Sequence, residues 1–163
     1  MTEMIDVVDE QDNILKTVPR KEVIDNILRH RGIQIFVFNS KGEILIHKRT
    51  MTKDSFPGFY DMSICGHVDS GENYDETAQR EIAEEIGARD VKIESLFKYS
   101  YEGDDNKVIA QAYKCIYDGE INFQKEEVET GFFVNIDKLK EMIEAEKFCP
   151  DSLVGYEKYE ELQ

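Results

Sequence analysis

Residues 66–88 read GHVDSGENYDETAQREIAEEIGA, and this stretch decides the fold of the 163-residue chain. Its second part predicts an amphipathic helix over residues 73–86, because apolar side chains recur every four residues. They form one stripe at Tyr74, Ala78, Ile82 and Ile86. Gly87 follows directly and is the residue type that most often ends a helix. The first part, with Gly66 and Gly71, predicts a tightly turning loop that exposes backbone carbonyls.

Three glutamates border this apolar stripe. Glu81 and Glu85 lie one helical turn apart, and Glu84 lies further round the same side of the helix. Like charges at this spacing repel one another, and carboxylate oxygens are the ligands that Mg²⁺ and Mn²⁺ prefer. The alternative is a solvated acidic helix face, although such a face should lie opposite the apolar stripe. Arg80 is the only Lys or Arg of the segment and is placed to bridge to Glu72, which would pin the loop to the helix.

The spacing of these residues resembles a known family signature. The pattern G-x5-E-x7-R-E-U-x-E-E-x-G-U, in which U is a bulky aliphatic residue, is the signature box of Nudix hydrolases. The chain matches every position from Gly66 to Gly87, and only Ala88 is smaller than usual. Residues 57–60, Pro-Gly-Phe-Tyr, also resemble the Pro-Gly-x-Trp sequence that often precedes the box.

This resemblance implies a divalent-metal-dependent hydrolase that cleaves a phosphoanhydride bond of a nucleoside diphosphate derivative or a related organic diphosphate. The implied cofactor is Mg²⁺, with Mn²⁺ as a second choice. By similarity, the implied metal ligands are Glu81, Glu84, Glu85 and the carbonyl of Gly66. Glu72 and Arg80 are implied to be structural. The catalytic base is expected among the box glutamates or at Glu127, for which ordinary surface charge is the alternative.

A second, looser resemblance covers most of the chain. Residues 63–67, Ser-Ile-Cys-Gly-His, look like the Cys-Gly-His segment of isopentenyl diphosphate isomerases, a branch of the same superfamily. His30 falls where those enzymes place a metal-binding histidine, and Cys65 falls at their catalytic cysteine. Lys107 and Val23 depart from the pattern, because they replace an expected catalytic acid and a second histidine. We therefore expect an isomerase-like subgroup of Nudix hydrolases that keeps its hydrolytic box.

Two side chains beside the box keep alternative interpretations. Cys65 is either a core residue or a proton-transfer residue of the isomerase type. His67 is either structural or a contact to substrate or metal. Two arginines are further candidates for a substrate phosphate: if strands 32–38 and 43–49 pair, Arg31 and Arg49 fall at the same end of the hairpin. The alternative role for these arginines is protection of a strand edge against aggregation.

The pattern of the whole chain predicts an α+β fold. Strands are expected in hairpins at residues 3–16, 32–48 and 91–117, with a further short strand at 131–134. Helices are expected from Pro19 to about Leu28, at 73–86, at 137–146 and after Pro150. By resemblance this is a Nudix-type α/β/α sandwich with a mixed β-sheet and an N-terminal β-hairpin extension. We expect one domain, 1–163, in which residues 1–30 are the extension.

The composition excludes some classes of partner. The chain carries 35 Asp and Glu against 20 Lys and Arg, a net charge of −15. This balance disfavours a nucleic acid polymer or an anionic membrane surface, but not a small-molecule diphosphate held through a metal. No apolar run reaches the length of a membrane helix, and three widely spaced cysteines predict a cytoplasmic protein with free thiols. The oligomeric state stays open, with a homodimer as one alternative.

Three hypotheses follow. The first is the metal-dependent hydrolase, which the intact box favours. The second is an isoprenoid diphosphate isomerase that uses Cys65, and Lys107 argues against it. The third is a catalytically silent Nudix domain that only binds a ligand.

Overall fold

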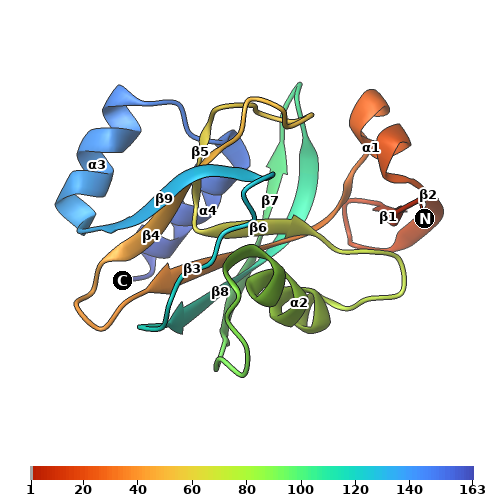
Figure 1. The fold of residues 1–163 in the computed structure, drawn as a ribbon. Helices are drawn as coiled ribbons and strands as arrows, with labels where there is room; N and C mark the ends of the chain where they lie inside the picture. Colours follow the sequence, from red (N-terminus) through yellow and green to blue (C-terminus); the bar gives the residue numbers. More distant parts are fainter. Residues whose placement is uncertain (1) are drawn as a thin grey trace.

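The computed structural model describes residues 2–163, and Met1 lies outside the described residues. Within that range the chain forms one nine-stranded mixed sheet and four helices (Figure 1). The strands are β1 (Met4–Val8), β2 (Ile14–Pro19), β3 (His30–Phe38), β4 (Ile44–Arg49), β5 (Tyr60–Met62), β6 (Ile64–His67), β7 (Glu94–Glu102), β8 (Lys107–Ile116) and β9 (Val128–Val134). The helices are α1 (Arg20–Asn26), α2 (Tyr74–Ile86), α3 (Ile136–Ala145) and α4 (Pro150–Glu161).

Strand β3 is the centre of the sheet. It pairs in parallel with β8 over its whole length, from His30 opposite Val108 to Phe38 opposite Ile116. It also pairs antiparallel with β6, which places Gly66 opposite Ile33. The sheet is therefore mixed, as the sequence predicts.

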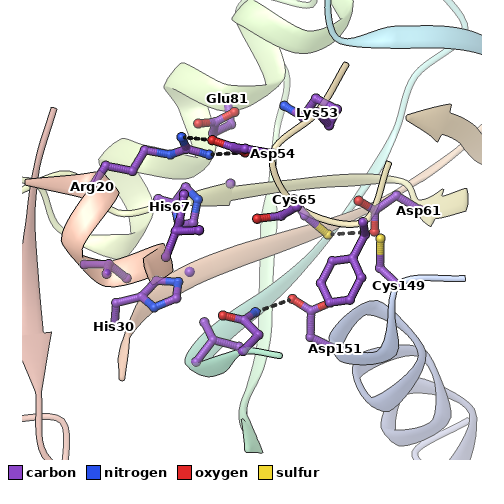
Figure 2. Close-up of a pocket in the computed structure, with 18 of the residues that line it drawn as sticks. Arg20, His30, Lys53, Asp54, Asp61, Cys65, His67, Glu81, Cys149 and Asp151 are labelled. Atoms are coloured by element: carbon purple, nitrogen blue, oxygen red, sulfur yellow. Dashed lines mark hydrogen bonds and ion pairs between the residues drawn. The ribbon is translucent and has the colours of Figure 1, made fainter. Parts of the chain in front are cut away.

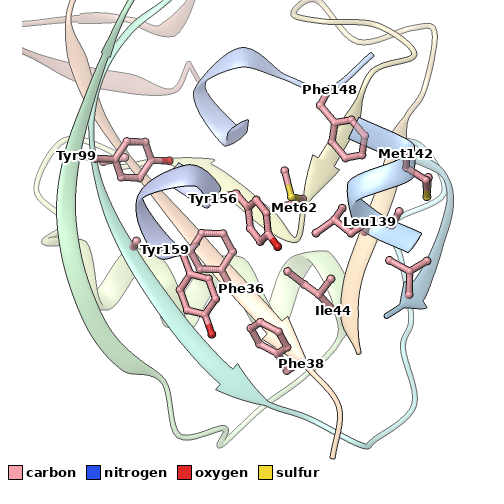
Figure 3. Close-up of a cluster of buried hydrophobic side chains, with 14 of the residues drawn as sticks. Phe36, Phe38, Ile44, Met62, Tyr99, Leu139, Met142, Phe148, Tyr156 and Tyr159 are labelled. Carbon is pink, nitrogen blue, oxygen red and sulfur yellow. The ribbon is translucent and has the colours of Figure 1, made fainter. Parts of the chain in front are cut away.

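Alternate residues of β3 enter two different cores, because successive side chains of a strand point to opposite faces. Ile33, Ile35 and Val37 pack against α2, together with its buried stripe Ala78, Ile82 and Ile86. On the other face, Phe36 and Phe38 pack against Tyr156 and Tyr159 of α4, in a core that also contains Leu139 of α3 (Figure 3). This arrangement is the predicted α/β/α sandwich.

The N-terminal extension has a small core of its own. Strands β1 and β2 form the predicted hairpin, and Ile5, Val7 and Val18 pack against Val23 of α1. Helix α1 begins directly after Pro19 and ends before Ile27, whose left-handed backbone (φ 51°) turns the chain toward β3. One pair, Val7 opposite His30, joins the extension to the central strand.

The structure differs from the sequence-based expectation in the strands around the site. The two short strands β5 and β6 are not predicted, because three or four residues carry too little alternation to reveal a strand. The hairpin expected from residues 32–48 is joined at only one pair, Phe38 opposite Ile44. Beyond that pair, β3 pairs with β6 and β8, whereas β4 pairs with β5 and β9. Arg31 and Arg49 are therefore not brought together.

None of the described helices is long and apolar enough to cross a membrane.

Candidate active site

Helix α2 positions the box glutamates, and local sequence fixes both of its ends. The side chain of Asn73 accepts a hydrogen bond from the backbone N–H of Glu76 and so caps the first turn. At the other end Gly87 adopts the left-handed conformation (φ 75°) that stops the helix. The buried stripe holds one face against β3 and β6, and the glutamates beside it border a cavity of about 720 Å³.

Arg80 ties the loop to the helix. Its Nε and Nη2 atoms donate to the two carboxylate oxygens of Glu72, both at 2.8 Å, and Nη2 also donates to the carbonyl of His67 at 3.2 Å. Its Nη1 atom donates to Glu81 at 2.9 Å and to Glu84 at 3.2 Å. The bridge to Glu72 that the spacing predicts is present, and the same guanidinium also neutralises part of the glutamate cluster.

Gly66 is required by a close approach of Glu81. A Cβ atom at residue 66 would lie 2.4 Å from Cδ of Glu81, much closer than real Cβ contacts. Gly66 lies in strand β6, not in the predicted loop, so its carbonyl is held by the sheet. The glycine therefore lets a buried carboxylate lie directly beside the backbone of β6.

Glu81 and Glu85 are the two box glutamates whose pKa values are raised. Burial, with the negative charge of Glu85, raises the pKa of Glu81 to about 8. Burial, with the charge of Glu127, raises the pKa of Glu85 to about 7. Glu127 itself pairs with Lys53. Within residues 2–163, Glu85 has no hydrogen bond or ion pair, so its carboxylate is free to accept a ligand.

The cavity is strongly acidic. Eleven Asp and Glu residues line it, against five Lys and Arg. Each of these five cations is already paired with a carboxylate: Arg20 with Asp54, Lys21 with Asp25, Arg49 with Asp61, Lys53 with Glu127 and Arg80 with Glu72. The cavity therefore contains more negative charge than its own cations compensate.

This donor set fits a divalent cation. Glu81, Glu84 and Glu85 offer hard carboxylate oxygens on one wall, and Gly66 lies directly beside Glu81. As they stand, no three His, Cys, Asp or Glu side chains in residues 2–163 are close enough to hold one ion. Arg80 Nη1 holds Glu81 and Glu84, so ligation requires these side chains to rotate.

The other predicted residues divide into two groups. Cys65, His67 and Arg49 line the cavity, as do Glu127 and the isomerase-like His30. Burial raises the pKa of the Cys65 thiol well above its usual value and lowers that of the His67 imidazole well below its usual value. Arg31 lies apart from this group.

Arg31, in β3, contacts the N-terminal extension and does not line the cavity. Its Nε atom donates to Asp12 at 2.6 Å, and its guanidinium lies 5.8 Å from the centre of the Tyr74 ring. The Arg49 guanidinium is also engaged, because Nε and Nη2 donate to the carbonyl of Ser55 and Nη1 donates to Asp61. Neither arginine presents a free guanidinium to a phosphate.

Sequence reasoning missed the part of the site next to α4. Asp61, Asn106, Cys149 and Asp151 line the cavity there, opposite the box helix. Asp61 comes from β5, which is too short to predict, and Asp151 lies in the first turn of α4, where an acid is an ordinary helix-start residue. Their meeting depends on the pairing of β4 with β5, which the sequence does not signal.

Comparison with known proteins agrees with this geometry. The NUDIX domain family matches residues 28–152 of the chain. The chain belongs to the Nudix family. The resemblance of the box is thus confirmed, and with it the enzyme class of the Nudix hydrolases.

Individual relatives cover almost the whole chain. The uncharacterized Nudix hydrolase PA4841 of Pseudomonas aeruginosa is 33% identical over 96% of this chain and 93% of its own length. The uncharacterized Nudix hydrolase YfcD of Escherichia coli is 30% identical over 93% of this chain and 83% of its own length. Among solved structures, the crystal structure of DR0079 from Deinococcus radiodurans has a TM-score of 0.80 and 28% identity, and covers 91% of this chain and 94% of that chain. Both curated relatives carry the name hydrolase and not isomerase.

Proposed function

We propose that this Nudix protein is a Mg²⁺-dependent hydrolase that cleaves a phosphoanhydride bond of a nucleoside diphosphate derivative or a related organic diphosphate. The observation that carries this proposal is the charge of the cavity. Its carboxylates outnumber its cations, and every lining Lys and Arg is already paired. A diphosphate therefore needs added positive charge in order to bind, and the box carboxylates are the ligands that can hold it.

Under this proposal the metal ligands are Glu81, Glu84, Glu85 and the Gly66 carbonyl. Mg²⁺, or Mn²⁺, bound there supplies charge neutralisation at the phosphoryl oxygens and activation of water. The chain itself fixes the ligands: Arg80 and Glu72 hold the loop that follows β6 against α2. Binding of the ion offsets the repulsion and burial that raise the pKa of Glu81 and Glu85.

Two carboxylates are candidates for the base that takes a proton from water. Glu85 has no protein partner, and Glu127 lies near it and pairs with Lys53. Separate Glu85→Gln and Glu127→Gln variants distinguish them, because loss of a metal ligand is relieved by excess Mg²⁺ and loss of the base is not.

The isomerase alternative finds little support in the site. Cys65 lines the cavity, but its thiol donates to Asp61 at 3.5 Å. Lys107 occupies the position of the expected acid, is 3.9 Å from Glu102 and does not line the cavity. Proton exchange into isopentenyl diphosphate that stops in a Cys65→Ala variant would favour this alternative. Tight binding of nucleotides without turnover would favour a silent binding domain.

The proposal is tested with a panel of nucleoside diphosphate derivatives and simple organic diphosphates, incubated with Mg²⁺ or Mn²⁺ and analysed by mass spectrometry. We expect monophosphate or phosphate products from at least one compound, and a loss of about 10²–10⁴-fold in Glu84→Gln and Glu85→Gln. The matched control is Glu76→Gln, which changes an exposed acid of the same helix outside the cavity lining. Equal rates in the box variants and the control would overturn the assignment.

A further inference from the structure

The cavity has a second end, opposite the box helix, that the proposed chemistry does not use. We call it the inner end and define it by five residues: Asp61 of β5, Cys65 of β6, Asn106, Cys149 and Asp151 of α4. Figure 2 shows the two aspartates and the two cysteines close together, on the side of the cavity away from His30 and His67. The inner end is therefore available to a part of a substrate that lies beyond the diphosphate.

Asp61 is buried and Asp151 is half-buried, and both retain unused hydrogen-bond acceptor capacity. Asp61, 3% exposed, receives hydrogen bonds from Arg49 and from the Cys65 thiol. Asp151 receives one from Asn106 at 3.2 Å and one from the backbone N–H of Ser152 at 3.0 Å. An ionised carboxylate can accept about four hydrogen bonds, so each aspartate retains unused acceptor sites.

The charge of the inner end is negative. Arg49 is the one cation that contacts it in residues 2–163, and the Nε and Nη2 atoms of that guanidinium donate to the carbonyl of Ser55. Burial, together with repulsion from the negative charge of Asp61, raises the pKa of Asp151. A ligand group with N–H or O–H donors would relieve this repulsion.

The floor of the cavity adds an acceptor that has no protein partner. His30 is only 3% exposed, and its Nδ1 atom contacts the carbonyl of Leu28 at 3.0 Å. Since a carbonyl only accepts, Nδ1 carries the hydrogen and Nε2 is left as an acceptor. Within residues 2–163 no hydrogen bond reaches Nε2, and His30 lines the cavity. Its ring lies 5.0 Å from that of His67.

These features make an apolar chain a poor occupant. A hydrocarbon in the inner end would displace water from two carboxylates and offer no hydrogen bond in return, and burial of polar groups without partners costs free energy. An alcohol or an ammonium group in the inner end would instead donate to Asp61 or Asp151. The carboxylates of the inner end therefore favour a group with hydrogen-bond donors over an apolar chain.

We propose that the inner end selects substrates whose organic group carries hydrogen-bond donors, an alcohol or an amine, and rejects an unsubstituted alkyl or isoprenoid chain. This inference rests on the proposed function, since it places the diphosphate at the box helix. Asp61 and Asp151 are the residues that determine specificity, and they act on the organic group and not on the reacting phosphorus.

The test uses three diphosphates that differ in one terminal group: 4-aminobutyl, 4-hydroxybutyl and pentyl diphosphate. With Mg²⁺ and the wild-type protein, we expect kcat/KM to be at least about tenfold higher for the amine than for the pentyl compound, with the alcohol between them. In Asp151→Asn this preference for the amine should shrink severalfold. Asp104→Asn is the matched control, because Asp104 is exposed, lies outside the cavity lining and loses the same charge.

Calorimetry with the same three compounds separates this inference from the proposed function. If none is hydrolysed but the amine and the alcohol bind more tightly than the pentyl compound, the hydrolase proposal fails. The inference that the inner end selects hydrogen-bond donors is then still supported. Equal or tighter binding of the pentyl compound, or no binding of any of the three, would overturn the inference. If Asp151→Asn fails to fold, Asp61→Asn provides the second variant, and an unchanged preference in a folded variant also counts against it.

Discussion

Glu81 lies directly against the backbone of Gly66, so that a Cβ atom at residue 66 would be 2.4 Å from Cδ of Glu81. The two residues come from different elements, helix α2 and strand β6, and the contact joins the box carboxylates to the edge of the sheet. The glycine is therefore explained by this close approach and needs no unusual backbone conformation. The contact also places Gly66 beside Glu81, one of the proposed metal ligands.

Gly66→Ala should displace Glu81 and lower activity more than stability. A misplacement of about 1 Å in a catalytic group can cost about 10²-fold in rate, whereas overpacking of this kind costs about 1–3 kcal/mol of the free energy of unfolding. Steady-state kinetics with Mg²⁺ and urea denaturation measure the two effects. Ser70→Ala, an exposed change in the following loop, is the control. Wild-type kcat/KM in Gly66→Ala would contradict the role given to this contact.

Arg80→Ala should destabilise the protein. The guanidinium makes hydrogen bonds to Glu72, Glu81 and Glu84, and its side chain is 27% exposed, so solvent compensates only part of the loss. We expect the free energy of unfolding to fall by about 1–3 kcal/mol, the range for charged hydrogen bonds left unmade. Chemical denaturation measures this, with Arg89→Ala as a control at an exposed arginine one residue beyond the box. Equal midpoints for the two variants would show that the network is not stabilising.

Asp151 should make stability depend on pH. Burial and the charge of Asp61 raise its pKa from 3.8 to about 6, so the folded state holds the proton more tightly than the unfolded state. This contribution to stability is fully present below about pH 3.8 and is lost as the pH rises through about 6. Because asparagine does not titrate, Asp151→Asn should gain about 2 kcal/mol relative to wild type between about pH 4 and pH 7. Stability curves that stay parallel over this range would contradict the raised pKa.

Arg31→Gln should change stability without changing catalysis. The Arg31 side chain pairs with Asp12 in the turn of the N-terminal hairpin and lies outside the cavity lining. Loss of this partly buried pair should lower the free energy of unfolding by about 1–2 kcal/mol, with kcat and KM unchanged. Kinetic and denaturation measurements on the same preparation provide the comparison. A raised KM in Arg31→Gln would contradict this prediction and indicate that Arg31 contacts the substrate.

The sequence predicts the box helix and its surroundings well, because those signals are local. The stripe through Ile82, the capping residue Asn73 and the stop at Gly87 depend on residues that are close together in the chain. The pattern of the box also places its glutamates on one wall of the cavity. The α/β/α architecture follows from resemblance and is confirmed by the two cores on either side of β3.

The inner end of the cavity could not be predicted, because it depends on long-range pairing. Asp61 reaches the cavity through β5, a three-residue strand held by β4, and Asp151 arrives from a helix about 90 residues later in the chain. The same cause explains the separation of Arg31 from Arg49. Local pattern favours a β3–β4 hairpin, whereas tertiary pairing with β6 and β8 takes β3 away from β4.

The most direct test of the central claim is hydrolysis in ¹⁸O-labelled water. A diphosphate substrate identified in the Mg²⁺ panel is turned over in this water, and its products are weighed by mass spectrometry. The account predicts one ¹⁸O atom in a phosphoryl product of the wild-type protein, no labelled product after chelation of the metal, and formation of labelled product at least about 10²-fold slower in Glu85→Gln. Labelled product that persists at the wild-type rate in Glu85→Gln, or after chelation, would contradict metal-dependent hydrolysis at the box glutamates.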